Sequence, residues 1–467
     1  MPKLMRCKYC GTLQDEPPGA KICAQCGGEL VWETPDIQSG GSYVRASLEL
    51  DQVSCPAGQT AERYLILSVS TPDEVPAAEQ VKTTVGRPPM HFCAVLDVSG
   101  SMRGNKISAA KKAVQQAVQR LQDGDTFSLV TFASDVRCSL DAKTVDGALR
   151  RIARSSIDEI QAGGQTALCG GLEEGIARVL KAPCDTNLVL LLSDGQANVG
   201  EVDIEAVGRR ALDARAKGIT VSTLGVGNDY NEAMMAEIAL DGGGRFYHIA
   251  HEGQIAAYLG GELGEMASLA ARNVKAILDL PAGTTLESLS SAYPVSGKSV
   301  SLGDIPVETH LEVVLRLLLP PQSAGTRLPV SGRVEYRTPA GNVCTTPLNT
   351  VTVRYEAEGV FENTLGVVKP TVRRVLEHMQ SVGVFATSKA ASLGADQGRE
   401  KGRTTISRMR AYAARLGEAD EEAKEILDEG SAIMNNFMAA SPQARSKAKA
   451  DTHAAMQRHR GSKDFKS

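Results

Sequence analysis

The sequence predicts an α/β protein, centred on a doubly wound parallel sheet over residues 91–269. In this central region strand-like and helix-like segments alternate, which is the pattern of a parallel sheet covered by helices on both faces. Segments that read only as strands flank it on both sides, at 43–90 and 270–355. The 467 residues also leave room for smaller units at each end of the chain.

Two Cys-x-x-Cys-Gly pairs lie within residues 1–30, and twelve residues separate the pairs. Two such turns supply four thiolates, which is the ligand set of a closed, tetrahedral structural Zn2+ site. A catalytic zinc needs an open position, and a redox pair needs a thioredoxin-like fold that does not fit in so short a segment. The segment resembles a short zinc ribbon, with Cys7, Cys10, Cys23 and Cys26 as its expected ligands.

Residues 31–42 are expected to form a linker, because they contain Pro35 and a Ser-Gly-Gly-Ser run. Over residues 43–90 apolar side chains alternate with others, as in half-buried strands. The clearest alternation is Val44, Ala46, Leu48 and Leu50. These strands do not fit the central parallel sheet. We expect them to form one β-sandwich with residues 270–355, so that the central domain is an insertion.

The central domain is expected to open with a strand buried on both faces, because the run from Phe92 to Leu96 is wholly apolar. Further strands are predicted at 127–132, 187–192, 219–226 and 245–249. Helices are predicted at 105–121, 143–155, 170–181, 204–217, 231–239 and 252–269, where apolar residues recur at helical spacing.

Small oxygen-bearing side chains follow the predicted strands. Asp97, Ser99 and Ser101 come directly after the first strand. Thr166 lies in a Gly-Gly-Gln-Thr loop, and Asp194 follows a later strand. Ligands of an open α/β sheet collect where the carboxyl ends of its strands meet, so we expect these side chains to converge. Carboxylate and hydroxyl oxygens suit a small hard cation that keeps some of its water, above all Mg2+.

These three pieces together resemble the metal-ion-dependent adhesion site of the von Willebrand factor A family. That family uses Asp-x-Ser-x-Ser on one loop, a Thr on a second and an Asp on a third, and this chain has no substitution among them. Other details look most like the branch near inter-alpha-trypsin inhibitor heavy chains and their bacterial relatives, where β strands flank the domain. These details are the segments 125–132, 193–200 and 244–248.

The resemblance implies a role for each residue. Ser99, Ser101 and Thr166 would bind Mg2+ through their hydroxyls, while Asp97 and Asp194 would act directly or through water. An open coordination position would then accept a Glu or Asp from a partner protein. Mn2+ or Ca2+ is an alternative ion, and a degenerate, metal-free domain is the alternative that the intact set of residues argues against.

The rest of the chain changes character. Residues 270–355 read as strands between Gly, Pro and Ser turns. Residues 356–440 carry apolar stripes at helical spacing, which predict a small helical bundle or hairpin. Residues 441–467 hold seven Lys or Arg against two Asp and are expected to be a basic flexible tail.

Composition argues against several classes of partner and location. The net charge of −4 and the aromatic content of 4% give no reason to expect nucleic acid or an acidic membrane surface as a partner. The apolar runs fall far short of the roughly twenty residues that span a bilayer, and the first residues lack the apolar stretch of a signal peptide. A cytoplasmic location is therefore expected.

Enzyme activity is not expected either. No Gly-x-Ser-x-Gly elbow surrounds Ser99 or Ser101, no nearby histidine offers a base, and Walker-type phosphate loops are absent. The leading hypothesis is a non-enzymatic, metal-dependent protein-interaction module. Two alternatives remain: an adaptor or co-chaperone for a MoxR-type AAA+ ATPase, and an assembly component that oligomerises through its helical segment.

Overall fold

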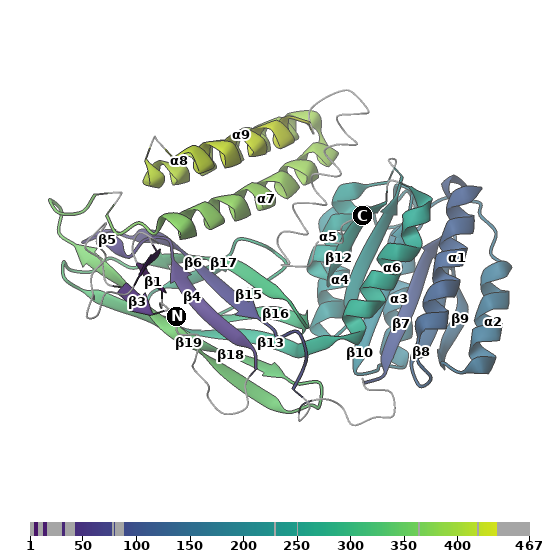
Figure 1. Ribbon diagram of the computed structural model, residues 1–467. Coiled ribbons are helices and arrows are strands. Elements are labelled where there is room, and N and C mark those ends of the chain that lie inside the picture. The colour runs from purple at the N-terminus through teal and green to yellow at the C-terminus, as the bar shows by residue number, and fades with distance from the viewer. Residues whose placement is uncertain are drawn as a thin grey trace.

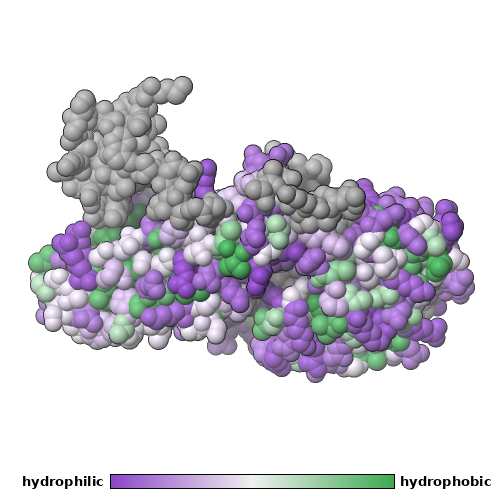
Figure 2. Space-filling model, turned by 90° about the horizontal axis from the view of Figure 1, so that it is seen from below, coloured by the Kyte–Doolittle hydropathy of each residue, from purple (hydrophilic) through white to green (hydrophobic). Residues whose placement is uncertain are grey.

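The computed structural model describes residues 43–76, 79, 88–227, 230–249, 251–362, 365–417 and 420–436, and three short strands at 4–7, 13–15 and 30–32. The described chain forms an α/β lobe and a β-sandwich lobe, and three helices lie across the sandwich (Figure 1). On the face shown in Figure 2, hydrophobic residues are scattered in small groups among hydrophilic ones. None of the helices in the described part combines the length and hydrophobicity that a membrane span requires.

A six-stranded sheet forms the centre of the α/β lobe. Its strands are β7 (Met90–Asp97), β8 (Thr126–Phe132), β9 (Val136–Thr144), β10 (Thr186–Ser193), β11 (Thr220–Val226) and β12 (Gly243–Ile249). Their order is β12-β11-β10-β7-β8-β9. Five strands are parallel, and β9 runs antiparallel at the edge. Every residue of β7 and β10 is buried, as expected of central strands covered on both faces.

Helices cover both faces of this sheet, which confirms the doubly wound α/β fold class. One face carries α1 (Asn105–Arg120), α2 (Gly147–Asp158) and α6 (Ile255–Ala267), and the other carries α3 (Leu168–Lys181), α4 (Ile204–Ala216) and α5 (Glu232–Asp241). The expected start of a helix at residue 143 is wrong, because β9 continues to Thr144. Asp146 caps α2 by accepting a hydrogen bond from the Leu149 N–H (2.6 Å), which determines its start.

The β-sandwich contains strands from both sides of the α/β lobe in the sequence. Before it come β4 (Arg45–Leu50), β5 (Ser54–Pro56) and β6 (Ala61–Ser70); after it come β13 (Leu269–Asp279), β14 (Thr285–Ser288), β15 (Val295–Ser296), β16 (Ser299–Pro306), β17 (His310–Leu319), β18 (Arg327–Arg337) and β19 (Val343–Glu356). The two sheets have the orders β15-β16-β13-β18-β19-β5 and β14-β17-β6-β4. Since β6 pairs with β17 along its whole length, the α/β lobe is inserted between two halves of the sandwich.

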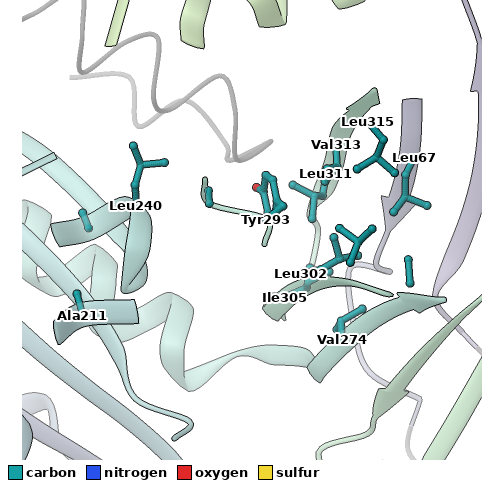
Figure 3. Packing of buried hydrophobic residues seen from close by; sticks show 14 of the residues in the cluster. Leu67, Ala211, Leu240, Val274, Tyr293, Leu302, Ile305, Leu311, Val313 and Leu315 are labelled. Carbon is teal, nitrogen blue, oxygen red and sulfur yellow. The ribbon is translucent and has the colours of Figure 1, made fainter. Parts of the chain in front are cut away.

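One continuous apolar core joins the two lobes. Within the sandwich, Leu67 and Val313 lie opposite Ile305 of the other sheet (Figure 3). Tyr293 lies between this core and Leu240 of α5, and it belongs to the same buried cluster. The two lobes therefore share a core rather than meeting through a solvated linker.

The sandwich contacts the amino ends of the central strands. Arg272 of β13 donates a hydrogen bond to Oγ1 of Thr186 (3.3 Å), which is the first residue of β10. A cavity between the lobes is lined by Thr220 and Gly243, the first residues of β11 and β12, and by Asp304 of β16. The carboxyl ends of the parallel strands therefore lie on the opposite edge, away from the sandwich.

Three helices cover the outer face of the four-stranded sheet (Figure 1). They are α7 (Lys369–Leu393), α8 (Ala395–Ala413) and α9 (Glu421–Asn436). Tyr64, Ile66 and Val314 of the sheet pack against their apolar stripes. The buried carboxylate of Asp51 accepts hydrogen bonds from the hydroxyl of Tyr412 (3.1 Å) and from Nη1 of Arg415 (2.6 Å). The expected helical segment therefore docks on the sandwich of its own chain.

Helix α7 also reaches the α/β lobe. Ser388 donates a hydrogen bond to Glu232 of α5 (3.1 Å), and Nζ of Lys389 lies 2.8 Å from Oε1 of Glu237. Close to this contact, burial raises the pKa of Asp241 to about 6, and the neighbouring Glu237 contributes to the increase. Helix α7 thus links the two lobes through a partly buried cluster of charges.

The N-terminal strands β1 (Leu4–Cys7), β2 (Leu13–Asp15) and β3 (Leu30–Trp32) form an antiparallel sheet in the order β2-β1-β3. The expected linker at 31–42 begins too early, because residues 31–32 pair with β1. Cys7 ends β1 opposite Leu30 of β3. Cys10, Cys23 and Cys26 and the expected tail at 441–467 lie outside the described residues, so both predictions stay predictions.

Candidate functional site

β7 places the first acidic side chain at the carboxyl edge of the sheet. Asp97 is the last residue of this strand and is fully buried. Its Oδ1 accepts a hydrogen bond from the backbone N–H of Ser99 (2.8 Å). Its Oδ2 accepts one from the hydroxyl of Ser193, the last residue of β10 (2.5 Å). One carboxylate oxygen is therefore held by the loop between β7 and α1, and the other by the end of β10.

Two serine hydroxyls connect this loop to the second acid. Oγ of Ser99 lies 3.0 Å from Oγ of Ser101, and Ser101 donates a hydrogen bond to Oδ1 of Asp194 (2.8 Å). Asp194 follows β10 directly and is fully buried, whereas Ser101 is exposed. The acids Asp97 and Asp194 are far apart in the sequence, and they meet because β7 and β10 are parallel neighbours.

Thr166 approaches the same place from the loop between α2 and α3. The backbone of Asn198 and its side chain hold it: Thr166 N donates to Oδ1 of Asn198 (2.8 Å), and Asn198 N donates to the Thr166 carbonyl (3.1 Å). A Cβ placed on Gly195 would lie 3.2 Å from Oγ1 of Thr166 and 3.4 Å from Oγ of Ser101. Both hydroxyls therefore flank the same glycine. The structure brings all five expected side chains to one site.

Backbone hydrogen bonds fix the first two loops against each other. Gly100 N donates to the carbonyl of Gly164 (3.0 Å), and Gly163 N donates to the carbonyl of Val98 (2.7 Å). Gly164 has a left-handed φ of +89°, and a Cβ there would lie 2.9 Å from Oγ of Ser134. Only glycine fits this position without strain, so the close packing of the loop between α2 and α3 against the turn between β8 and β9 depends on it.

Burial dominates the electrostatics of the site. Desolvation raises the pKa of Asp97, hydrogen bonds from Ser193 and Ser99 oppose that increase, and the nearby carboxylate of Asp194 adds to it. Lys106 supplies positive charge, because its Nζ forms an ion pair with Oδ2 of Asp194. Two buried acids in one place favour the binding of a cation.

The donor set fits a small hard cation. Its five side chains offer carboxylate and hydroxyl oxygens, with no nitrogen or sulfur, as Mg2+ and related ions prefer. Gly195 leaves a space between Thr166 and Ser101 that even a methyl group would narrow. Among the residues that the structure describes, no cluster of three or more His, Cys, Asp or Glu side chains is arranged to hold a metal. An ion at this site would therefore depend on the hydroxyls as much as on the acids.

Sequence reasoning did not identify three contributors. Ser193 holds Asp97, Asn198 holds Thr166, and Lys106 pairs with Asp194. A signal existed for the first, since Ser193 is a polar residue at the end of an otherwise apolar strand next to a predicted ligand. A weaker signal existed for Lys106, which is a basic residue in the first turn of a helix. Asn198 gave no sequence signal beyond its position in the loop after β10.

A polar groove of about 750 Å3 runs beside the site. The turn between β8 and β9 lines one side of it with Ser134 and Arg137, and the loop before α3 lines the other with Gln161. Its inner end is formed by Val98 and Gly164, which belong to the two loops that carry the candidate ligands. The groove therefore adjoins the loops that carry the candidate ligands, although the ligands themselves do not line it.

Comparison with known sequences identifies the central lobe. The family model of the von Willebrand factor type A domain matches residues 93–259. The uncharacterized protein YfbK of Escherichia coli (strain K12) is 29% identical over 249 residues, covering 51% of this chain and 43% of that protein. Inter-alpha-trypsin inhibitor heavy chain H3 of Rattus norvegicus is 27% identical over 215 residues, covering 44% of this chain and 24% of that protein. The chain thus spans less than half the length of these curated relatives.

Solved structures extend the similarity of fold to the flanking parts. A von Willebrand factor type A protein from Catenulispora acidiphila is 19% identical with a TM-score of 0.55, covering 84% of this chain and 98% of that one. The ArnB paralog VWA2 from Sulfolobus acidocaldarius is 17% identical with a TM-score of 0.60, and the match covers 90% of this chain and 100% of that one. Coverage of this extent includes strands and helices outside the central lobe.

Proposed function

Residues 93–259 form a von Willebrand factor type A domain, and we propose that this domain is a non-enzymatic, metal-dependent protein-interaction module. One observation carries the proposal: oxygen donors from three separate loops converge at a single place on the carboxyl edge of the sheet. These donors belong to Asp97, Ser99, Ser101, Thr166 and Asp194.

Each of these residues has a role in the proposal. The hydroxyls of Ser99, Ser101 and Thr166 bind Mg2+, or alternatively Mn2+ or Ca2+, and the carboxylates of Asp97 and Asp194 bind it directly or through water. Ser193 and Asn198 hold two of these ligands in position. Bound Mg2+ supplies an electrophilic position that accepts a carboxylate oxygen. Hydroxyls neutralise little of its charge, which favours a carboxylate from outside the chain.

Two features favour a protein as the source of this carboxylate. The sandwich packs at the amino ends of the strands, away from the site, and Ser101 of the site is exposed. The adjoining groove of about 750 Å3 offers polar groups to the residues that flank the acid in the partner chain. An AAA+ ATPase of the MoxR type is an alternative identity for this partner.

The described surroundings support the expectation that the site is not catalytic. Ser99 is hydrogen-bonded to Ser101, and Ser101 to Asp194, without a histidine in that chain of contacts. His91 lies at the other end of β7, bonded to Ser128 (2.9 Å). The apolar stripes of α7–α9 are buried on the sandwich of their own chain, which argues against oligomerisation through these stripes.

A structural Zn2+ held by Cys7, Cys10, Cys23 and Cys26 belongs to the same proposal. Its support is the spacing of the cysteines and the antiparallel pairing that ends β1 at Cys7. Four thiolates leave no open position, so this ion would stabilise the N-terminal segment and take no part in binding through the A domain.

Affinity capture with the immobilised full chain tests the interaction. The wild type in Mg2+ is compared with the wild type in EDTA, with Asp97→Ala and with Asp123→Ala, an exposed acid of the same domain. We expect a partner that the wild type and Asp123→Ala retain in Mg2+, and that EDTA and Asp97→Ala both release. Retention of the same partner by folded Asp97→Ala, with and without EDTA, would contradict metal-dependent binding. Circular dichroism verifies that each variant is folded.

A further inference from the structure

Lys106 lies inside the candidate metal site and is not one of its expected ligands. Its Nζ pairs with Oδ2 of Asp194, while Ser101 donates to Oδ1 of the same carboxylate. The Lys106 side chain is 29% exposed and the Asp194 side chain is 0% exposed. We propose that Lys106 is a built-in counter-ion that competes with the metal for Asp194 and so sets the metal affinity of the site. This inference rests on the proposed function.

The position of Lys106 in its helix supports this assignment. It is the second residue of α1, where the helix dipole is positive and a cation is disfavoured. The first turn contains no acidic residue, and no side chain caps it. The ion pair with Asp194 is therefore the interaction that offsets this unfavourable location.

The loop after β11 leaves room for the lysine. Gly227 has a left-handed φ of +79°, and a Cβ there would lie 3.6 Å from Nζ of Lys106 and 3.7 Å from its Cε. Any other residue at this position would be strained by the left-handed φ, and its Cβ would lie in van der Waals contact with the end of the Lys106 side chain. Three elements thus meet around Lys106: the start of α1, the end of β10 and the end of β11.

The charges of the site explain what Lys106 does. Asp97 and Asp194 are both buried, and Lys106 neutralises one of them in the absence of a metal ion. A divalent cation that engages Asp194 must displace this ammonium group, and the partly exposed lysine has a path to solvent. Lys106 therefore stabilises the metal-free site and weakens metal binding. It also leaves one more positive charge beside the loaded site, which favours a carboxylate of the partner.

Isothermal titration of MgCl2 into the full chain tests this inference. The proteins are the wild type, Lys106→Met, the charge-preserving Lys106→Arg and the control Lys112→Met, an exposed lysine of the same helix. We expect Lys106→Met to bind Mg2+ about tenfold more tightly than the wild type. The wild type, Lys106→Arg and Lys112→Met should have similar affinities. Thermal melts in EDTA should show a lower Tm for Lys106→Met, because it leaves Asp194 without its cation.

Three other outcomes can be told apart. If the wild type binds Mg2+ and Lys106→Met binds it equally or more weakly, the competition is refuted while the proposed function stands. If neither protein binds Mg2+, both proposals fail. Binding by Lys106→Met alone would support the competition directly, because the lysine would then be the group that keeps the wild-type site free of metal.

Discussion

Replacing Gly195 by alanine should impair metal binding without removing any candidate ligand. The new Cβ would lie 3.2 Å from Oγ1 of Thr166, which is closer than an ordinary contact, so this hydroxyl must move by a few tenths of an ångström; it would lie 3.4 Å from Oγ of Ser101, at the limit of an ordinary contact. Gly195 has no left-handed φ, so the substitution introduces no backbone strain. Mg2+ requires near-octahedral geometry with short, uniform distances to oxygen. We therefore expect at least about a tenfold loss of affinity, or roughly 1.4 kcal/mol.

Isothermal titration with MgCl2 measures this effect, and thermal melts in EDTA verify that the variant is folded. Gly253→Ala is the matched control, because a Cβ there meets no atom within 4 Å. The control should bind Mg2+ with the affinity of the wild type. If folded Gly195→Ala also binds Mg2+ with the wild-type affinity, then the hydroxyl of Thr166 does not contact the ion, and the assigned ligand set is wrong.

Two further predictions concern the scaffold. Asp241→Asn should be more stable than the wild type at pH 7.5 by up to roughly 3 kcal/mol and equal to it only below the ordinary pKa of 3.8, because burial raises the pKa of Asp241 from 3.8 to about 6. The buried carboxylate that destabilises the wild type forms as the pH rises through this range. Denaturant unfolding at several pH values measures the difference in stability between the two proteins. A difference that does not change with pH would contradict the prediction. Arg415→Met should lower the free energy of unfolding by about 3–5 kcal/mol, because it removes the ion-pair partner of the buried carboxylate of Asp51. Arg410→Met, at an exposed position of α8, is the control, and an equal effect of both would contradict the role of the ion pair.

The acidic residues of the site could be predicted from the sequence because each of them lies at the end of a predicted parallel strand. Asp97 and Asp194 each follow an apolar strand, and parallel strands bring their carboxyl ends to one edge. Thr166 was predictable only through the family resemblance, because it follows no strand and is held by Asn198. Lys106 was out of reach, since its ion pair depends on a tertiary contact between α1 and the end of β10.

The edge strand β9 shows why the alternating pattern of a real strand can be missed in a sequence. Val136, Cys138, Leu140 and Ala142 alternate along it, yet only Leu140 is buried. An edge strand with one solvated face carries few large apolar residues, so its signal is weak.

The apolar stripes of α7–α9 gave a clear signal, but it did not identify what the helices pack against. They predicted buried faces, but the sequence did not show that Tyr64 and Val314 of the sandwich cover them.

The insertion of the A domain into the sandwich has a consequence for binding. The lobes share one buried core, and α7 ties the sandwich to α5 through Lys389 and Glu237. The candidate metal site thus lies on a firmly held domain and faces away from that junction. A rigid support of this kind keeps loops from three parts of the sequence in register for one ion.

Titration of Mg2+ into the EDTA-washed full chain tests the central claim most directly. The account predicts saturable binding of a single ion by the wild type, strongly weakened in Asp194→Asn and in Thr166→Ala. Mg2+ disfavours thiolates, so the N-terminal cysteines should not contribute to this signal. Absence of binding to the wild type and to Lys106→Met alike, or equal binding by the wild type, Asp194→Asn and Thr166→Ala, would show that the converging oxygen donors are not a metal site.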